Sequence, residues 1–146
     1  MITITVPGVP VAQPRQRMAN IGGFLRNYTP TRDPVNAWKA SIRLAWHAAT
    51  SEPPATGPIH LRIAFAMPRP QRLAAKKYAG RRVPHDKRPD ADNLVKATKD
   101  ALTGLAWRDD SQVYELYCVK QYAAADEQPH AVIEVLGCDD GILEEL

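Results

Sequence analysis

The chain has 146 residues, of which 45% are hydrophobic and 24% are charged, and its net charge is +3. This length corresponds to about one domain, with enough residues to bury a core without disulfides. Cys118 and Cys138 lie far apart and form neither a CxxC motif nor a zinc-binding spacing, so we expect a reduced, cytoplasmic protein. Secretion and membrane insertion are not expected, because the sequence has neither a basic-then-apolar leader nor an apolar run long enough to span a bilayer.

The charges are segregated along the chain. Between Arg69 and Arg88 there are eight basic residues and a single acidic one, Asp86. After Lys120 there is no Lys or Arg, while seven acidic residues follow. The basic segment is expected to attract polyanions, and the acidic end to repel them.

The N-terminal part contains one clear strand and one clear helix. Apolar residues and threonines alternate over residues 2–6, which predicts a strand with one buried face. Residues 7–32 contain several prolines and a Gly-Gly pair, which indicates a long loop or a loose hairpin of the kind that is usually functional or mobile. Asp33 followed by Pro34 is a typical helix start, and apolar residues at helical spacing predict a helix over 34–49.

Three further strands are predicted. Strict alternation over residues 59–67 gives the clearest strand of the chain, and 113–122 and 131–136 also have strand character. One short helix is expected near Leu73–Tyr78 in the basic segment. The fold class is therefore a single α+β domain, residues 1–146, with a small mixed sheet covered by two main helices and an acidic tail at residues 137–146.

The second main helix, from about Ala91 or Asp92 to Leu102, concentrates its polar residues on one side. At 100° per residue they fall within an arc of about 120°. These residues are Asp92, Asn93, Lys96, Lys99 and Asp100. The opposite, apolar side can pack on a sheet. Asp90 lies just before the helix, and Asp109 and Asp110 follow it, so carboxylates bracket the helix.

Carboxylates are the ligands that hard divalent cations prefer. In a basic protein, a carboxylate cluster would repel a polyanionic substrate unless Mg2+ or Mn2+ lay between them. The pattern therefore predicts metal-dependent phosphate chemistry on nucleic acid. A purely structural interpretation stays open, with Asp92 as an N-cap, the lysines as a solvated face and Asp109 and Asp110 as a turn.

The motifs resemble the RusA family of Holliday junction resolvases, which are small endodeoxyribonucleases common in phages and prophages. The similar block covers about residues 87 to 120. It comprises Lys87-Arg88-Pro89-Asp90-Ala91-Asp92-Asn93-Leu94-Val95-Lys96, Asp100-Ala101-Leu102, Trp107-Arg108-Asp109-Asp110-Ser111-Gln112-Val113 and Val119-Lys120. The N-terminal segment with Pro14-Arg15-Gln16-Arg17 and Tyr28-Thr29-Pro30 is similar to phage members more loosely.

The resemblance implies that Asp90, Asp92 and Asp110 bind a divalent metal, Mg2+ or Mn2+, and that Lys96 takes part in catalysis. Asp109 is a less certain partner. It also implies a homodimer that cuts four-way DNA junctions symmetrically in recombination and repair, since a two-fold dimer supplies two equivalent sites.

DNA contact is predicted for the basic segment and for the N-terminal arginines, because phosphate contacts dominate nucleic-acid affinity. The predicted contact residues are Arg15, Arg17, Arg69, Arg72, Arg81, Arg82 and Arg88. His85 lies near the cluster in sequence and is a minor candidate for contact with DNA or metal. Trp107 is predicted to be a packing anchor that positions Asp109 and Asp110.

Two other functions use the same residues. A metal-dependent phosphohydrolase of small nucleotides would need an enclosed pocket rather than a basic segment. A non-catalytic DNA-binding module, or a decayed prophage enzyme, would use the aspartates only as helix caps.

Overall fold

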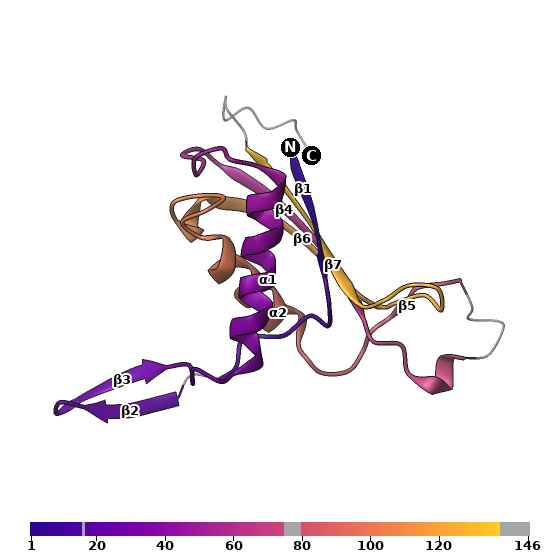
Figure 1. The fold of residues 1–146 in the computed structure, drawn as a ribbon, viewed down its shortest axis with the longest axis horizontal. Helices are drawn as coiled ribbons and strands as arrows, with labels where there is room; N and C mark the ends of the chain where they lie inside the picture. The colour runs from indigo at the N-terminus through magenta and orange to yellow at the C-terminus, as the bar shows by residue number, and fades with distance from the viewer. Residues whose placement is uncertain (16, 75–79, 138–146) are drawn as a thin grey trace.

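The computed structural model describes residues 1–15, 17–74 and 80–137, and it has one large sheet, one small sheet and two main helices (Figure 1). The large sheet is mixed and has five strands. Its strands are β1 (Ile2–Pro7), β4 (Ile59–Met67), β5 (Val83–Pro84), β6 (Val113–Tyr122) and β7 (His130–Gly137). The small sheet is a hairpin of β2 (Arg17–Ile21) and β3 (Phe24–Tyr28). The helices are α1 (Pro34–Ala49) and α2 (Ala91–Leu102), with 3-10 turns η1 (Gln71–Leu73) and η3 (Asp110–Gln112).

The five strands are arranged in the order β1-β7-β4-β6-β5. The central pair β4 and β6 is parallel, and the other pairs are antiparallel. A parallel pair cannot be joined by a tight turn, so the chain between β4 and β6 must cross over the sheet, and α2 forms part of that crossover. The topology therefore places α2, with its carboxylates, on the sheet face beside β6.

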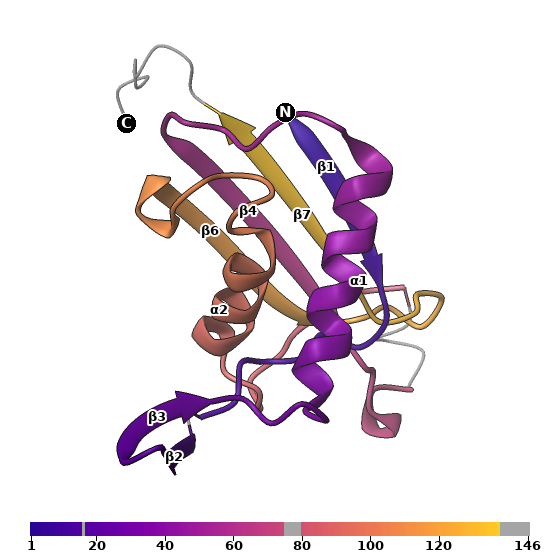
Figure 2. The ribbon, with the colours of Figure 1, turned by 60° about the vertical axis from the view of Figure 1, so that its left-hand side comes forward.

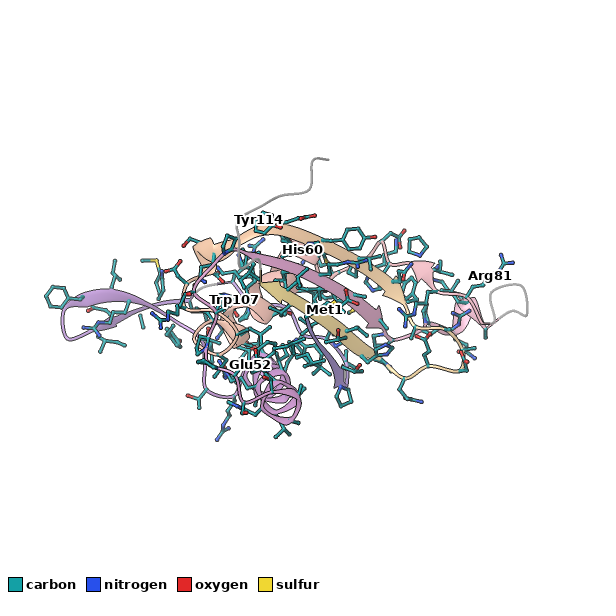
Figure 3. The ribbon with its side chains drawn as sticks, turned by 90° about the horizontal axis from the view of Figure 1, so that it is seen from above. Met1, Glu52, His60, Arg81, Trp107 and Tyr114 are labelled. Carbon is teal, nitrogen blue, oxygen red and sulfur yellow. The ribbon has the colours of Figure 1, made fainter. Side chains whose placement is uncertain are left out.

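Both helices lie on the same face of the sheet (Figure 2). The core is formed between them and the inward-facing residues of the strands, among which Leu61, Ile63, Phe65 and Ile133 are almost fully buried. Figure 3 shows Tyr114 and His60 on the side of the sheet away from α1. Because strand side chains alternate between the two faces, one face of the sheet builds the core, and no helix of the described residues covers the other.

The amphipathic design of α2 is confirmed. Its buried residues are Leu94, Val95, Ala97, Thr98, Ala101 and Leu102. Thr98 is the one polar residue among them. Its hydroxyl donates to the Leu94 carbonyl at 3.1 Å, because a buried polar group needs a hydrogen-bond partner. Two contacts with α1 hold the helix laterally: Lys39 pairs with Asp100 at 3.7 Å, and Arg43 donates to the Ala101 carbonyl at 3.3 Å.

The predicted α+β class is confirmed, and the main elements match their predicted ranges closely. The strand predicted at 131–136 is longer by one residue at each end. Of the two alternatives predicted for residues 7–32, a long loop or a hairpin, the structure has the hairpin. Strand β5 was not predicted, because its two residues have no periodicity and are set only by pairing with Tyr122 and Gln121.

Most of the short helix expected near Leu73–Tyr78 lies outside the described residues. A 3-10 turn occupies Gln71–Leu73, starting directly after Pro70, and residues 75–79 lie outside the described part of the chain. Of the predicted acidic tail, residues 138–146 also lie outside it. No helix among the described residues is long and apolar enough to cross a membrane.

The assigned core predicts that a buried and an exposed apolar residue differ clearly in how much they contribute to stability. Replacing the buried Phe65 with alanine should lower the free energy of unfolding by about 3–5 kcal/mol, because it removes apolar contacts and leaves a cavity. Leu44→Ala on the solvent side of α1, where the side chain is 73% exposed, is the matched control and should change stability by less than about 0.5 kcal/mol. Urea unfolding of both variants measures the difference; equal effects would contradict the assigned core.

Candidate active site

Two carboxylates lie at the N-terminus of α2. Asp90 is the N-cap residue, with extended backbone angles of φ −69° and ψ 142°, yet its side chain makes no capping hydrogen bond. Asp92 lies in the first turn and accepts from the Asn93 backbone N–H at 3.0 Å. Both residues are exposed. The positive end of the helix dipole favours negative charge at this position.

The loop that leads into α2 is held by Lys120 of β6. Its ammonium group donates to the Lys87 carbonyl at 2.7 Å and to the Pro89 carbonyl at 2.6 Å. Lys120 pairs in register with the buried Phe65, so it points to the face of the sheet that the helices cover. The sequence contained this signal, since Lys120 lies two residues before Tyr122 and therefore shares the inward face of the strand, but no role was predicted from it.

His85 also belongs to this supporting layer. Its backbone N–H donates to the Lys120 carbonyl at 3.1 Å, and its ring packs against Tyr122 with a centroid distance of 4.5 Å. Burial, together with the nearby charge of Lys120, lowers the pKa of His85 below its ordinary value. The ring is therefore packed inward, which supports a structural role rather than contact with substrate.

An open recess of about 410 Å³ lies beside Asp90. It is lined by Arg15, Arg88, Pro89, Asp90 and Asn93. Arg15 is brought here because the backbone N–H of Gln13 donates to the Asn93 carbonyl at 2.9 Å. The structure thus brings together two predicted DNA-binding arginines and one predicted metal ligand, although 75 residues separate Arg15 from Asp90 in the sequence.

Asp110 meets the same helix nearer its C-terminus. Its Oδ1 accepts from the Thr103 hydroxyl at 3.0 Å and from Trp107 Nε1 at 3.4 Å, and its Oδ2 pairs with Lys99 at 3.6 Å. Trp107 is fully buried, which confirms it as a packing anchor. Lys99 follows Asp92 by two turns on the same helix face, a rise of about 10 Å.

The neighbouring Asp109 has a different role. Its side chain accepts from the backbone N–H of Ser111 at 2.8 Å and from the Ser111 hydroxyl, and it forms a reciprocal capping box with Gln112. These hydrogen bonds hold the pKa of Asp109 below its ordinary value. Gln112 also donates to the carbonyls of Ala55 and Gly57, both at 2.9 Å. Asp109 therefore fixes the turn that carries Asp110.

The three predicted metal ligands do not form one compact set in the single chain. Within the described ranges, no group of three or more His, Cys, Asp and Glu side chains is placed to hold a metal ion. Asp90 and Asp92 fit part of a hard-cation site, because their exposed oxygens have lone pairs left for a ligand. Asp110 lies farther along the same face, where Lys96 and Lys99 are also presented.

The predicted DNA-binding arginines fall into two groups. Three of them are used within the protein: Arg69 donates to the carbonyls of Leu73, Arg81 and Ala123; Arg72 donates to the Tyr122 hydroxyl at 3.0 Å; Arg82 pairs with Glu127 at 3.0 Å. Arg15, Arg17, Arg81 and Arg88 are exposed. Figure 3 places Arg81 at the end of the molecule opposite the hairpin, so the arginines do not form one continuous patch.

Exposed carboxylates thus lie at the N-terminus of α2, beside arginines and a row of lysines. Comparison with known proteins identifies the family. The model of "Endodeoxyribonuclease RusA" matches residues 7–136, which is nearly the whole chain. The protein belongs to the RusA endodeoxyribonuclease family, and this membership implies endonuclease activity on Holliday junctions.

A similar protein occurs in Bacillus subtilis (strain 168). It is named "Uncharacterized protein YqaN" and is 32% identical over 142 residues, an alignment that covers 92% of this chain and 94% of the relative. The similarity therefore extends over the whole domain of both proteins, although the relative's name assigns it no activity.

Lys120→Met should loosen the loop before α2. The substitution keeps much of the side-chain volume but removes two charge-assisted hydrogen bonds, and we expect a loss of about 1–3 kcal/mol in stability. Amide hydrogen exchange should become faster at residues 85–92. The control is Lys87→Met in the same loop, where the lysine is exposed. Unchanged protection of the loop in Lys120→Met would show that this lysine does not hold it.

Proposed function

We propose that this protein hydrolyses phosphodiester bonds of branched DNA at the N-terminal half of α2, with the help of Mg2+ or Mn2+. The observation that supports this most is the recess in which Asp90 lies between Arg15 and Arg88. The arginines attract a phosphate backbone, and the carboxylate repels it unless a cation intervenes. A surface that only bound DNA would gain nothing from the exposed pair Asp90 and Asp92.

Asp90 and Asp92 would hold the metal, whereas Asp110 lies farther along the helix and is not grouped with them among the described residues of the single chain. A bound cation would supply Lewis-acid stabilisation of the charge that develops on the scissile phosphate. Lys96 lies one helical turn from Asp92 on the exposed face, where its ammonium group can stabilise negative charge on the phosphate oxygens. Lys99 and Thr103 bind the Asp110 carboxylate and hold it beside the C-terminal half of α2.

An open site suits a polymer better than a small molecule. Pockets that bind nucleotides enclose most of the ligand and are largely apolar. The recess at Asp90 is open, and four of its five lining residues are charged or polar. This supports the nuclease function over hydrolysis of free nucleotides. Symmetrical cutting of a four-way junction requires two equivalent sites, and we propose that a homodimer supplies them.

Asp92→Asn tests the chemistry. The variant keeps the size of the side chain and removes the charge that would bind the metal, so nicking of a synthetic four-way junction with Mg2+ should fall by about 1,000-fold or more. Binding of the junction with Ca2+ should change little. Asp109→Asn is the matched control, because asparagine also caps turns well and Asp109 serves only as a cap. Nicking by Asp92→Asn at the control's rate would remove Asp92 from the chemistry.

If Arg15 and Arg88 contact phosphates, they should contribute to the salt dependence of DNA binding. Replacing both with glutamine should flatten the slope of log affinity against log salt by about two, because each phosphate contact contributes about 0.9. Arg82→Gln is the control, since Arg82 is already paired with Glu127 and should change the slope less. Fluorescence anisotropy at several salt concentrations measures the slopes. A larger effect from Arg82→Gln than from the double variant would place the phosphate-binding surface elsewhere.

A further inference from the structure

The β2–β3 hairpin stands out from the body of the protein (Figures 1 and 2). Its strands are joined by Gly22 and Gly23, whose φ angles of 62° and 84° are both positive. Two consecutive positive φ angles at the turn are what a tight two-residue hairpin requires, and glycine adopts them without steric cost. The hairpin therefore ends in a narrow tip, with Ile21 and Phe24 facing each other across it.

This tip is apolar and exposed. Phe24 is 70% exposed and Ile21 is 55% exposed, and every described residue from 17 to 28 except Ala19 is classed as exposed. An isolated two-stranded hairpin is marginally stable in water. Large apolar side chains exposed at the end of such a hairpin indicate that the tip contacts another molecule.

The strand register sorts the side chains into two different faces. The pairs Arg17 with Tyr28, Ala19 with Arg26 and Ile21 with Phe24 share one face. The other face carries Met18, Asn20, Leu25 and Asn27. Aromatic and basic groups therefore lie together on the first face, whereas the second has no charged residue. Cationic groups interleaved with aromatic rings suit nucleic acid, which offers phosphates and base planes.

The base of the hairpin is attached to the candidate active site. Gln13, four residues before β2, donates its backbone N–H to the Asn93 carbonyl of α2 at 2.9 Å. Its side-chain amide donates to the Thr29 hydroxyl at 3.5 Å, so both ends of the hairpin are tied at the same place. Each strand has five residues, which gives the hairpin a reach of about 17 Å from this base.

We propose that the hairpin is a wedge that opens the branch point of the DNA substrate. In this arrangement Ile21 and Phe24 insert between bases at the junction, and Arg17 and Arg26 contact the flanking phosphates. This inference rests on the proposed nuclease function and deepens it. Apolar side chains that enter a base stack must separate the bases, and this costs least where the stacking is already interrupted.

Charge favours DNA over a second copy of the protein as the partner of the hairpin. The first 32 residues contain four arginines and no Asp or Glu. In a two-fold dimer built on this surface, each hairpin would meet its own copy, and arginines would face arginines. Phosphates instead offer the opposite charge. The wedge would place the branch point at a set distance from Asp90, which links recognition of the branch to the position of the cut.

The test uses 2-aminopurine at the branch point of a four-way junction, with Ca2+ in place of Mg2+. Fluorescence should rise when the wild-type protein binds, because the reporter base is unstacked, and a linear duplex should give no rise. Phe24→Ala should abolish the rise and reduce the preference for junction over duplex by about tenfold. Leu25→Ala is the matched control: its side chain is 69% exposed at the same tip, but it lies on the other face. It should behave like the wild type.

Three results would overturn the wedge. The first is a wild-type complex with no change in fluorescence. The second is an equal loss of the fluorescence rise in Phe24→Ala and Leu25→Ala. The third is a change in the sedimentation mass of Phe24→Ala, which would assign the tip to self-association. Nicking of the junction with Mg2+ is measured separately. A wild-type protein that binds and opens the junction but does not nick it would overturn the proposed chemistry and leave the wedge supported.

Discussion

The burial of one side of α2 against the sheet is the constraint on which the site depends. Six residues of α2 between Leu94 and Leu102 are buried. Burial of each large apolar side chain among them stabilises the folded protein by about 1.5–3 kcal/mol. Rotation of the helix by one residue would expose part of this surface. The same packing that stabilises the fold therefore fixes Asp92, Lys96 and Lys99 on the outer side, in one row along the helix. Lys120 holds the loop before the N-terminus of α2 and so fixes where the helix begins.

Adjacent aspartates have separate tasks because the backbone directs them differently. Asp109 precedes a 3-10 turn, so its side chain folds back to cap that turn and its lone pairs are used locally. Asp110 is the first residue of the turn and points toward Thr103 and Lys99 instead. Gln112 fixes the turn to the loop at Ala55 and Gly57. Within four residues, Asp109 caps the turn, Asp110 is the predicted metal ligand, and Gln112 connects the turn to a distant loop.

The positive charges are distributed over the long axis of the molecule rather than collected in one patch. The hairpin lies toward one end, and Arg81 lies at the other (Figure 3). Near Arg81, other arginines are bonded internally: Arg82 pairs with Glu127, and Arg69 donates to the Arg81 carbonyl. Electrostatic attraction at both ends with carboxylates between them suits an extended polyanion that crosses the site, and it offers little to a compact anion.

Local patterns in the sequence determined the elements of this protein. Alternation predicted the strands at 2–6 and 59–67, and the 3.6-residue period predicted which side of α2 is buried, because both depend only on side chains close together along the chain. Tertiary structure alone decided that Arg15 adjoins Asp90, that Lys120 supports the loop, and that Asp110 meets α2 at Lys99 rather than at Asp92. These contacts join residues from separate elements, and their geometry follows from how the elements pack, which no local period specifies.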